Sequence, residues 1–431
     1  LDGAGTPDLF QADLVDLLSG SGIAKLGGLT MPRMTDKTEE FIALEERWSA
    51  HNYHPLDVVI ERAEGPWVYS VEGRRYLDCL SAYSAVNQGH CHPEILEALK
   101  EQATRVTLTS RAFRNDQLPV FCEKLAALCG LDAVVPMNTG AEAIETAIKA
   151  ARRWGYSHKS IAADKAEIIV CENNFHGRTT TIVGFSSDPG SRKGFGPFTP
   201  GFVSIPFGDI LALRAAISPN TCAFLVEPIQ CEAGIYIPPD GFLREAAEVC
   251  RANSVLLMLD EIQTGLGRTG RMFCADHEDV RPDAFVLGKA LTGGFYPVSA
   301  VVGTKELIGV FDPGSHGSTY GGNPLGCAVA LEALSVIERQ QLVARSAELG
   351  KWLLNELSRL RNSAIKEIRG RGLLVAIELY GSARHACEQL KEQGILCKET
   401  HDHVIRVTPP LVVEREDLEW AVERFCKVFG V

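Results

Sequence analysis

Short apolar runs alternate with helix-like stretches from about residue 92 to residue 325. Runs such as AEIIVCE at 166–172 and VLLMLD at 255–260 are apolar at nearly every position, as in strands buried on both faces. Between them, stretches such as AEAIETAIKAARRWG at 141–155 repeat apolar residues with helical spacing. Because alternating helices and strands build parallel sheets, the sequence predicts a large α/β domain with a mostly parallel sheet over residues 81–325.

The two ends of the chain show different patterns. Beyond Pro324, helical segments enclose two apolar runs, LLVAIEL at 373–379 and HVIRVTPP at 403–410, which predicts a smaller α+β domain over residues 326–431. Near the other end, WVYSVEGRRYLDCL at 67–80 alternates apolar and polar residues around a Glu-Gly turn, which indicates a hairpin. We expect residues 36–80 to pack with the smaller domain. Residues 1–35 carry Gly and Ser with little periodicity and predict a flexible extension.

Composition narrows the classes of partner and compartment. A formal net charge of -12 argues against nucleic acid or an anionic membrane as the main partner. The thirteen cysteines are an odd number without a CxxC motif, which favours reduced thiols in an intracellular protein. No apolar stretch approaches the roughly 20 residues that span a bilayer. We expect a cytoplasmic protein, with the mitochondrial matrix as the alternative, since the chain begins at Leu1 and a transit peptide could have been removed.

Asp260 and Lys289 carry the clearest chemical signal. Asp260 closes the buried run at 255–260, and Lys289 follows 29 positions later in VLGKALTGG. Ligands of open α/β sheets bind beyond the carboxyl ends of the strands, so a carboxylate at that edge indicates a partner. An amine for a Schiff base and an anion for a pyridinium nitrogen are the protein groups that pyridoxal phosphate most needs. The pair predicts a pyridoxal phosphate enzyme, although a lysine after a glycine is by itself more often a surface residue.

A phosphate site is predicted where the strand VVPM leads through Thr139 and Gly140 into a helix. The backbone N–H groups of Gly140 and Ala141 at the helix start, together with the helix dipole, would bind a phosphate dianion. A plain helix cap is the alternative, and it would be favoured if Lys289 and Asp260 were not present.

Two other motifs point to different chemistry. GLGRTG at 265–270 is a literal GxGxxG, but the residues after it lack helical periodicity, so the strand–turn–helix context of a dinucleotide site is missing. His90, Cys91 and His92 have the residue types of metal ligands. Adjacent residues rarely converge on one ion, and no comparable cluster follows at zinc spacing, so we predict no metal site.

Four further residues have a possible functional role and an ordinary structural one. Arg178, after the run at 166–172, can clamp a carboxylate with two hydrogen bonds, or can be a surface arginine. Phe175 can lie on a cofactor ring or belong to the core. Ser318 and Thr319 offer hydroxyls in a Gly-rich loop, suited to a phosphate and equally to a turn.

Taken together in order, these motifs resemble the class III (omega) aminotransferases of fold-type I, from about residue 40 to the C-terminus. The matching segments are HNYHPL, SAYSAVNQGHCHPEI, MNTGAEAIETAIK, NNFHGRT, EPIQCEAGI, LDEIQTGLGRTG, LGKALTGGFYPVSA and STYGGNP. The resemblance implies pyridoxal 5'-phosphate bound covalently by Lys289, with Asp260 on its ring nitrogen and Gln263 on its hydroxyl. Its remaining cofactor-binding residues would be Thr139, Gly140, Ala141, Phe175, His176, Ser318 and Thr319. The last two would come from the neighbouring subunit of a homodimer.

The resemblance also implies a substrate pair, read from Tyr53, Tyr83, Arg178, Glu232 and Arg406. The δ-amine of L-ornithine would pass to 2-oxoglutarate, giving glutamate and glutamate 5-semialdehyde, which cyclises to pyrroline-5-carboxylate. Acetylornithine or 4-aminobutyrate as amine donor, and an aminomutase of the same fold, stay open as alternatives. The sequence departs from the family pattern at Cys231, more often Gly, and at Ala141, commonly Val, so substrate breadth and thiol sensitivity are open.

Overall fold

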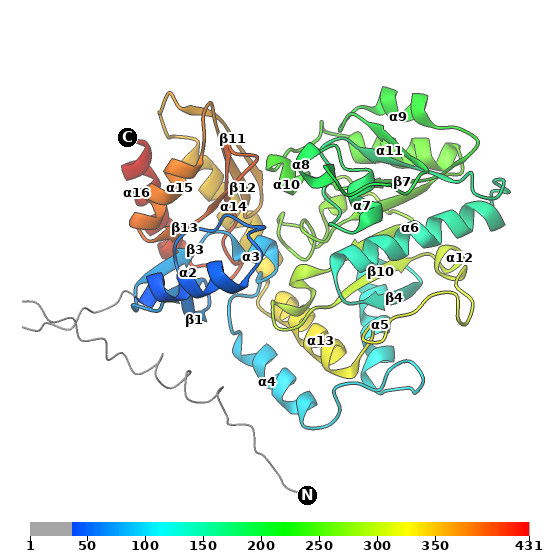
Figure 1. Cartoon of the computed structure of the whole chain (residues 1–431), viewed down its shortest axis with the longest axis horizontal. Helices are drawn as coiled ribbons and strands as arrows, with labels where there is room; N and C mark the ends of the chain where they lie inside the picture. The colour runs from blue at the N-terminus through cyan, green and yellow to red at the C-terminus, as the bar shows by residue number, and fades with distance from the viewer. Residues whose placement is uncertain (1–36, 431) are drawn as a thin grey trace, which may run out of the picture. The chain divides into compact units, whose positions relative to one another are not determined.

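The computed structural model describes residues 37–430, which fall into two units divided after Val59. The first unit contains α2 (Lys37–Trp48), none of whose residues is buried. The extension predicted over residues 1–35 lies outside the described residues. All other elements belong to the second unit, which begins at Ile60 and contains three sheets (Figure 1).

A seven-stranded sheet forms the centre of the second unit, with strand order β4-β10-β9-β8-β7-β5-β6. Its strands are β4 (Ala133–Met137), β5 (Glu167–Cys171), β6 (Phe202–Ile205), β7 (Thr221–Val226), β8 (Leu256–Asp260), β9 (Ala284–Leu287) and β10 (Ser299–Gly303). Only β10 runs against its neighbours, β4 and β9, and the others are parallel. The predicted mostly parallel sheet is therefore confirmed.

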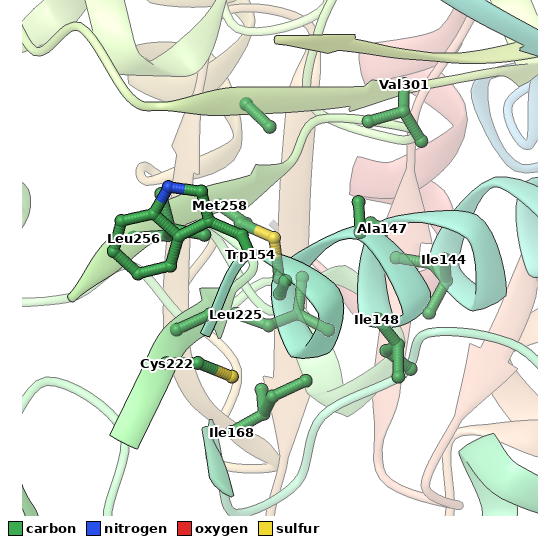
Figure 2. Packing of buried hydrophobic residues seen from close by; sticks show 14 of the residues in the cluster. Ile144, Ala147, Ile148, Trp154, Ile168, Cys222, Leu225, Leu256, Met258 and Val301 are labelled. Atoms are coloured by element: carbon green, nitrogen blue, oxygen red, sulfur yellow. The ribbon is translucent and has the colours of Figure 1, made fainter. Parts of the chain in front are cut away.

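Helix α6 (Gly140–Ser157) shows why this sheet is stable. Its apolar residues recur at helical spacing, and they pack on side chains from strands β5, β7, β8 and β10 (Figure 2). The helix contributes Ile144, Ala147, Ile148 and Trp154, and the strands contribute Ile168, Cys222, Leu225, Leu256, Met258 and Val301. Burying one such aliphatic side chain contributes about 1.5–3 kcal/mol, so this one face holds α6 in place and fixes where its first residue lies.

Two four-stranded sheets lie outside the central one. The first contains β1 (Ile60–Glu64), β2 (Trp67–Ser70), β3 (Arg75–Asp78) and β13 (Ile395–Leu396), and the second β11 (Ile365–Arg371), β12 (Leu374–Leu379), β15 (Val404–Val407) and β14 (Lys398–Thr400). Strands β2 and β3 form the predicted antiparallel hairpin. β3 pairs in parallel with β13, so the N-terminal hairpin and the C-terminal part of the chain share a sheet. The domain boundaries given above stay a prediction.

Helices connect and cover the sheets. After the short α3 (Ser81–Ser84), they are α4 (Pro93–Ala103), α5 (Gln117–Cys129), α7 (Thr180–Gly184), α8 (Pro189–Arg192), α9 (Ile210–Ala216), α10 (Cys231–Gly234), α11 (Phe242–Ala252), α12 (Lys305–Ile308), α13 (Pro324–Arg339), α14 (Leu342–Leu357), α15 (Arg384–Glu392) and α16 (Arg415–Phe429). Two 3-10 turns cover Cys274–His277 and Lys289–Thr292.

The GLGRTG segment packs closely against the turn between β11 and β12. A Cβ on Gly372 would lie 2.6 Å from the backbone nitrogen of Gly270, so only glycine fits this approach of two backbones. The fully buried Arg268 donates to the carbonyl oxygens of Leu373 at 2.8 Å and Pro409 at 2.6 Å. Leu373 lies in the β11–β12 turn and Pro409 follows β15, so the loop after β8 is joined to the second four-stranded sheet.

The cysteines and the helices also bear on the expectations from composition. All thirteen cysteines are free thiols. In residues 37–430, no helix is long and apolar enough to cross a membrane. Over the same residues, no group of three or more His, Cys, Asp or Glu side chains could hold a metal ion.

Candidate active site

The candidate site lies where the parallel strands of the central sheet end. Asp260 is the last residue of β8, and Lys289 follows β9 after one glycine. Phe175 and His176 follow β5, and Gly140 begins α6 after β4. Because these strands run in one direction, the polar groups meet at one edge of the sheet.

A cavity of about 200 Å³ opens at this edge. Seven of the predicted cofactor residues line it, namely Gly140, Ala141, Phe175, His176, Asp260, Gln263 and Lys289. Its other lining residues are Gly177, Glu227, Ile229, Ile262 and Thr264.

Asp260 is held by two donors. One carboxylate oxygen accepts the Ile262 backbone N–H at 3.1 Å, and the other accepts from Nδ1 of His176 at 2.7 Å. Both side chains are buried, and Nε2 of His176 has no hydrogen-bond partner in the described residues. The imidazole thus orients the carboxylate, which faces the cavity with a fixed geometry.

The side-chain amine of Lys289 is suited to act as a nucleophile. Burial lowers the pKa of its amine, and the nearby Arg406 lowers it further, while Glu232, Cys231 and Asp260 act in the opposite direction. A lower pKa increases the share of neutral amine at physiological pH, which is the form that attacks a carbonyl.

Glu227 is the cavity residue that the sequence reasoning missed. It accepts the Phe175 backbone N–H at 2.9 Å, and burial, reinforced by Asp260, raises the pKa of its carboxyl well above the ordinary value. The signal was present, because Glu227 directly follows the buried strand β7, as Asp260 closes β8. A carboxylate where a buried strand ends is therefore the same signal at Glu227 as at Asp260.

At the start of α6, Thr139 caps the helix and the next two residues line the cavity. Thr139 is the N-cap: its hydroxyl accepts the Glu142 N–H at 3.3 Å, and the Glu142 carboxylate accepts the Thr139 N–H at 2.8 Å. Thr139 is exposed and does not line the cavity, whereas Gly140 and Ala141 do. The capping interpretation therefore describes the Thr139 side chain here, and its contact with a phosphate stays a prediction.

Glu232 and Arg406 form the predicted ion pair. Their charged atoms are 2.7 Å apart, and the guanidinium carbon of Arg406 lies 4.7 Å from the ring centroid of Tyr83. Burial raises the pKa of Glu232, but the charges of Arg406 and Lys289 outweigh it and leave the pKa below its ordinary value. Gln263 also donates to the same carboxylate oxygen at 3.4 Å, which links the pair to the cavity wall.

The other predicted residues have separate surroundings. Arg178 is exposed, lies 5.7 Å from the Phe175 ring and donates to the Ser191 hydroxyl at 3.3 Å. The Ser318 hydroxyl accepts from the Asn138 amide at 3.0 Å, and Thr319 is exposed. Tyr53 belongs to the first unit and is exposed. The roles of these residues stay predictions.

The cavity fits pyridoxal phosphate. It offers a carboxylate for a ring nitrogen, a buried amine for a carbonyl and the start of an 18-residue helix for a phosphate. A Cβ on Gly140 would lie 3.0 Å from Ile262, so a larger residue would crowd the phosphate end. The buried, unpartnered Nε2 of His176 is a further polar atom available to a ligand.

Comparison with known proteins shows the family to which the chain belongs. A family model for class-III aminotransferases matches residues 48–429. An ornithine aminotransferase from Brevibacillus brevis is 60% identical over 395 residues, which are 92% of this chain and 99% of that protein.

Three solved structures are also similar. The ornithine aminotransferase of Toxoplasma gondii ME49 has a TM-score of 0.90 at 46% identity, covering 92% of this chain and 96% of that one. An acetylornithine aminotransferase from Elizabethkingia anophelis has a TM-score of 0.84 at 48% identity, covering 92% and 99%. Another structure of the Toxoplasma gondii enzyme has partial occupancy of pyridoxal phosphate in its active site. The chain belongs to the class III aminotransferases, which use pyridoxal phosphate as their cofactor.

Proposed function

We propose that the protein is an ornithine δ-aminotransferase, which converts L-ornithine and 2-oxoglutarate into glutamate 5-semialdehyde and L-glutamate. The observation that carries the proposal is the Glu232–Arg406 ion pair, which Gln263 joins to the cavity wall, with Tyr83 stacked on the arginine. The two substrates differ in charge near the reacting carbon, and an arginine that can be paired or released suits both. The similarity to ornithine aminotransferases supports the same assignment.

Pyridoxal phosphate, when bound, supplies the carbonyl that takes up the amine and the ring that accepts the electrons of the broken C–H bond. In this proposal Lys289 holds the cofactor and then, as a neutral amine beside the substrate carbon, moves the proton. Asp260, oriented by His176, pairs with the ring nitrogen. Gly140 and Ala141 bind the phosphate through their backbone N–H groups, and Phe175 packs on the ring.

The ion pair sets which end of each substrate reacts. Ornithine has one carboxylate, which Arg178 binds in this proposal, and a free Arg406 would compete for it and misplace the δ-amine. Glu232 prevents this competition by neutralising Arg406. Glutamate has two carboxylates and needs both arginines, so Arg406 must leave Glu232. The exchange replaces one charge-assisted contact with another, which keeps its cost small.

N-acetylornithine is the second candidate amine donor, because the Elizabethkingia acetylornithine aminotransferase is 48% identical to this chain. A donor panel separates the candidates. The holoenzyme is assayed with 2-oxoglutarate and L-ornithine, N-acetylornithine or 4-aminobutyrate, and pyrroline-5-carboxylate is measured as the ornithine product. We expect the highest kcat/KM for L-ornithine. A higher kcat/KM for N-acetylornithine would overturn the assignment.

We also propose a homodimer with shared sites, in which Ser318 and Thr319 reach the cofactor phosphate of the partner subunit. Thr319 is exposed within its own chain, which leaves its hydroxyl accessible to a second copy. Sedimentation velocity on the holoenzyme tests the proposal, and a fully active monomer would contradict it. Thirteen free thiols support a reducing compartment, for which we propose the cytoplasm.

A further inference from the structure

The turn that carries Tyr83 has an unusual backbone. Ser81, Ala82, Tyr83 and Ser84 have φ values of 51°, 45°, 60° and 68°, which are left-handed. L-residues other than glycine enter this region mostly singly, because the Cβ crowds the following carbonyl oxygen. Four in succession, with no glycine among them, persist only if the surroundings hold them.

Asp78 holds the start of this turn. One of its carboxylate oxygens accepts the backbone N–H groups of Leu80 at 2.8 Å and Ser81 at 2.9 Å. The other oxygen lies 2.8 Å from Nε2 of His90. His90 is itself fixed by two backbone hydrogen bonds with Gly65, at 3.0 and 2.8 Å. One carboxylate oxygen therefore binds the turn, and the other binds His90, which orients the carboxylate.

The turn is also joined to the strand that carries Arg406. The Ser81 hydroxyl donates to the Thr408 carbonyl oxygen at 2.6 Å, and the Thr408 N–H donates to the Cys79 carbonyl oxygen at 2.8 Å. Thr408 lies two residues after Arg406. The position of the turn therefore fixes the Tyr83 ring over the guanidinium group, 4.7 Å away.

We propose that Asp78, oriented by His90, is a positioning residue for substrate choice: it holds the left-handed turn that keeps Tyr83 stacked on Arg406. This proposal rests on the proposed function. The stacking occurs while Arg406 is paired with Glu232, so it stabilises the paired state that ornithine requires. His90, the first histidine of the His-Cys-His segment, thus acts by orienting the Asp78 carboxylate.

The test compares the two half-reactions by single-turnover spectroscopy of the holoenzyme. Asp78→Ala removes both acceptors, and we expect the rate with L-glutamate relative to L-ornithine to rise about 2- to 30-fold, which converts to about 0.5–2 kcal/mol of cation–π stabilisation. Asp78→Asn keeps an acceptor for both N–H groups and should restore most of the wild-type ratio. If Asp78→Ala does not fold, Ser81→Ala, which removes the bond to Thr408, should shift the ratio in the same direction.

A double-mutant cycle with Tyr83→Leu separates positioning from general destabilisation. If Asp78 acts through Tyr83, Asp78→Ala should leave the ratio unchanged in the Tyr83→Leu background, and additive effects would overturn the proposal. Asp209→Ala is the matched control, because Asp209 also accepts a backbone N–H, from Ala212 at 2.9 Å, but caps α9. It should lower stability without changing the ratio.

Amide hydrogen exchange gives a readout that is independent of activity. The Leu80 and Ser81 amides should exchange faster in Asp78→Ala than in wild type and Asp78→Asn, and equal exchange in all three would overturn the proposal. If the wild-type enzyme does not react with L-ornithine, the proposed function fails, whereas the exchange experiment still decides whether Asp78 holds the turn.

Discussion

The cofactor end and the ion-pair end of the site are built in different ways. The cofactor end consists of Gly140, Asp260 and Lys289, which follow strands of one sheet and occupy positions set by its core. The ion-pair end consists of Glu232, Arg406 and Tyr83, which come from α10, from β15 of another sheet and from a left-handed turn. In the proposed function the cofactor end keeps one arrangement with both substrates, whereas Arg406 at the ion-pair end exchanges its partner between them.

This difference matches the chemistry that each end must perform. The cofactor is the same in both half-reactions, so its ligands gain from rigidity. The substrates alternate, so the groups that recognise them must change partners at low cost. Substitutions at the cofactor end should therefore lower both half-reactions together, whereas substitutions at the ion-pair end should change their ratio.

Lys289→Ala should have the largest effect and should not discriminate between substrates. Loss of the amine removes the group that moves the proton, and we expect both half-reactions to slow about 10⁴-fold. Pyrroline-5-carboxylate formation and single-turnover spectra measure the loss. Borohydride reduction of the wild-type holoenzyme, followed by peptide mapping, is the control, and labelling of another lysine would contradict the assignment.

Asp260→Asn should come next. The amide keeps the shape and an acceptor for the Ile262 N–H, but it cannot stabilise a protonated ring nitrogen as an anion does, so kcat should fall about 10²- to 10³-fold with both substrates. Circular dichroism should show an unchanged fold. A near-normal kcat would mean that the charge on Asp260 is not needed.

Glu232→Ala should change the rates of the two half-reactions unequally. It leaves the buried Arg406 without its carboxylate, and we expect the glutamate half-reaction to gain about 10- to 100-fold relative to the ornithine one. Some transfer of the α-amine of ornithine should also occur. Product analysis checks this expectation. An unchanged ratio with only δ-transfer would show that Glu232 does not control which amine of ornithine reacts.

Acidification should remove the contribution of the same pair to stability. The pKa of Glu232 is lowered in the folded protein, because Arg406 and Lys289 outweigh the opposing effect of burial. A lowered pKa adds stability above the unfolded value of about 4.3 and loses it as the pH falls through the folded pKa. The excess stability of wild type over Glu232→Gln, measured by urea unfolding, should therefore shrink below about pH 4. A constant excess would contradict the ion-pair account.

Thr139→Ala should have the smallest effect. Loss of the N-cap costs about 1 kcal/mol of unfolding free energy. Thr304→Ala is the matched control, since Thr304 caps α12 and does not line the cavity. If Thr139 also contacts the phosphate, only Thr139→Ala should weaken binding of pyridoxal phosphate. Equal cofactor affinity in the two variants would limit Thr139 to a cap.

Much of the cofactor end could be predicted because its signals are local. Asp260 closes an apolar run and Gly140 opens an amphipathic helix, so each is recognised within about ten residues of sequence. Strand β10 could not be predicted in the same way. Its run SAVVG resembles any short buried strand, and only pairing with β4 and β9 shows that it is antiparallel.

The family resemblance, and not a pattern of apolar and polar residues, predicts the residues of the ion-pair end. Glu232 and Arg406 are 174 positions apart, and no periodicity links them. The left-handed turn at Ser81–Ser84 was also invisible, because it contains no glycine, which is the residue that usually marks such a backbone. Its conformation depends on hydrogen bonds that the turn donates to the Asp78 carboxylate and to the Thr408 carbonyl oxygen.

The glycines of GLGRTG have a consequence for how sequence motifs arise. Gly270 occupies the position of the third glycine in a GxGxxG motif, yet what excludes a side chain there is the backbone of Ala347, 2.9 Å from where its Cβ would be. Gly372 approaches the same segment from another strand turn. Two unrelated requirements, close approach of a phosphate or close approach of a peptide backbone, can therefore produce the same GxGxxG pattern. The buried Arg268 within the motif distinguishes them here, because its Nη1 donates to the carbonyl oxygens of Leu373 and Pro409.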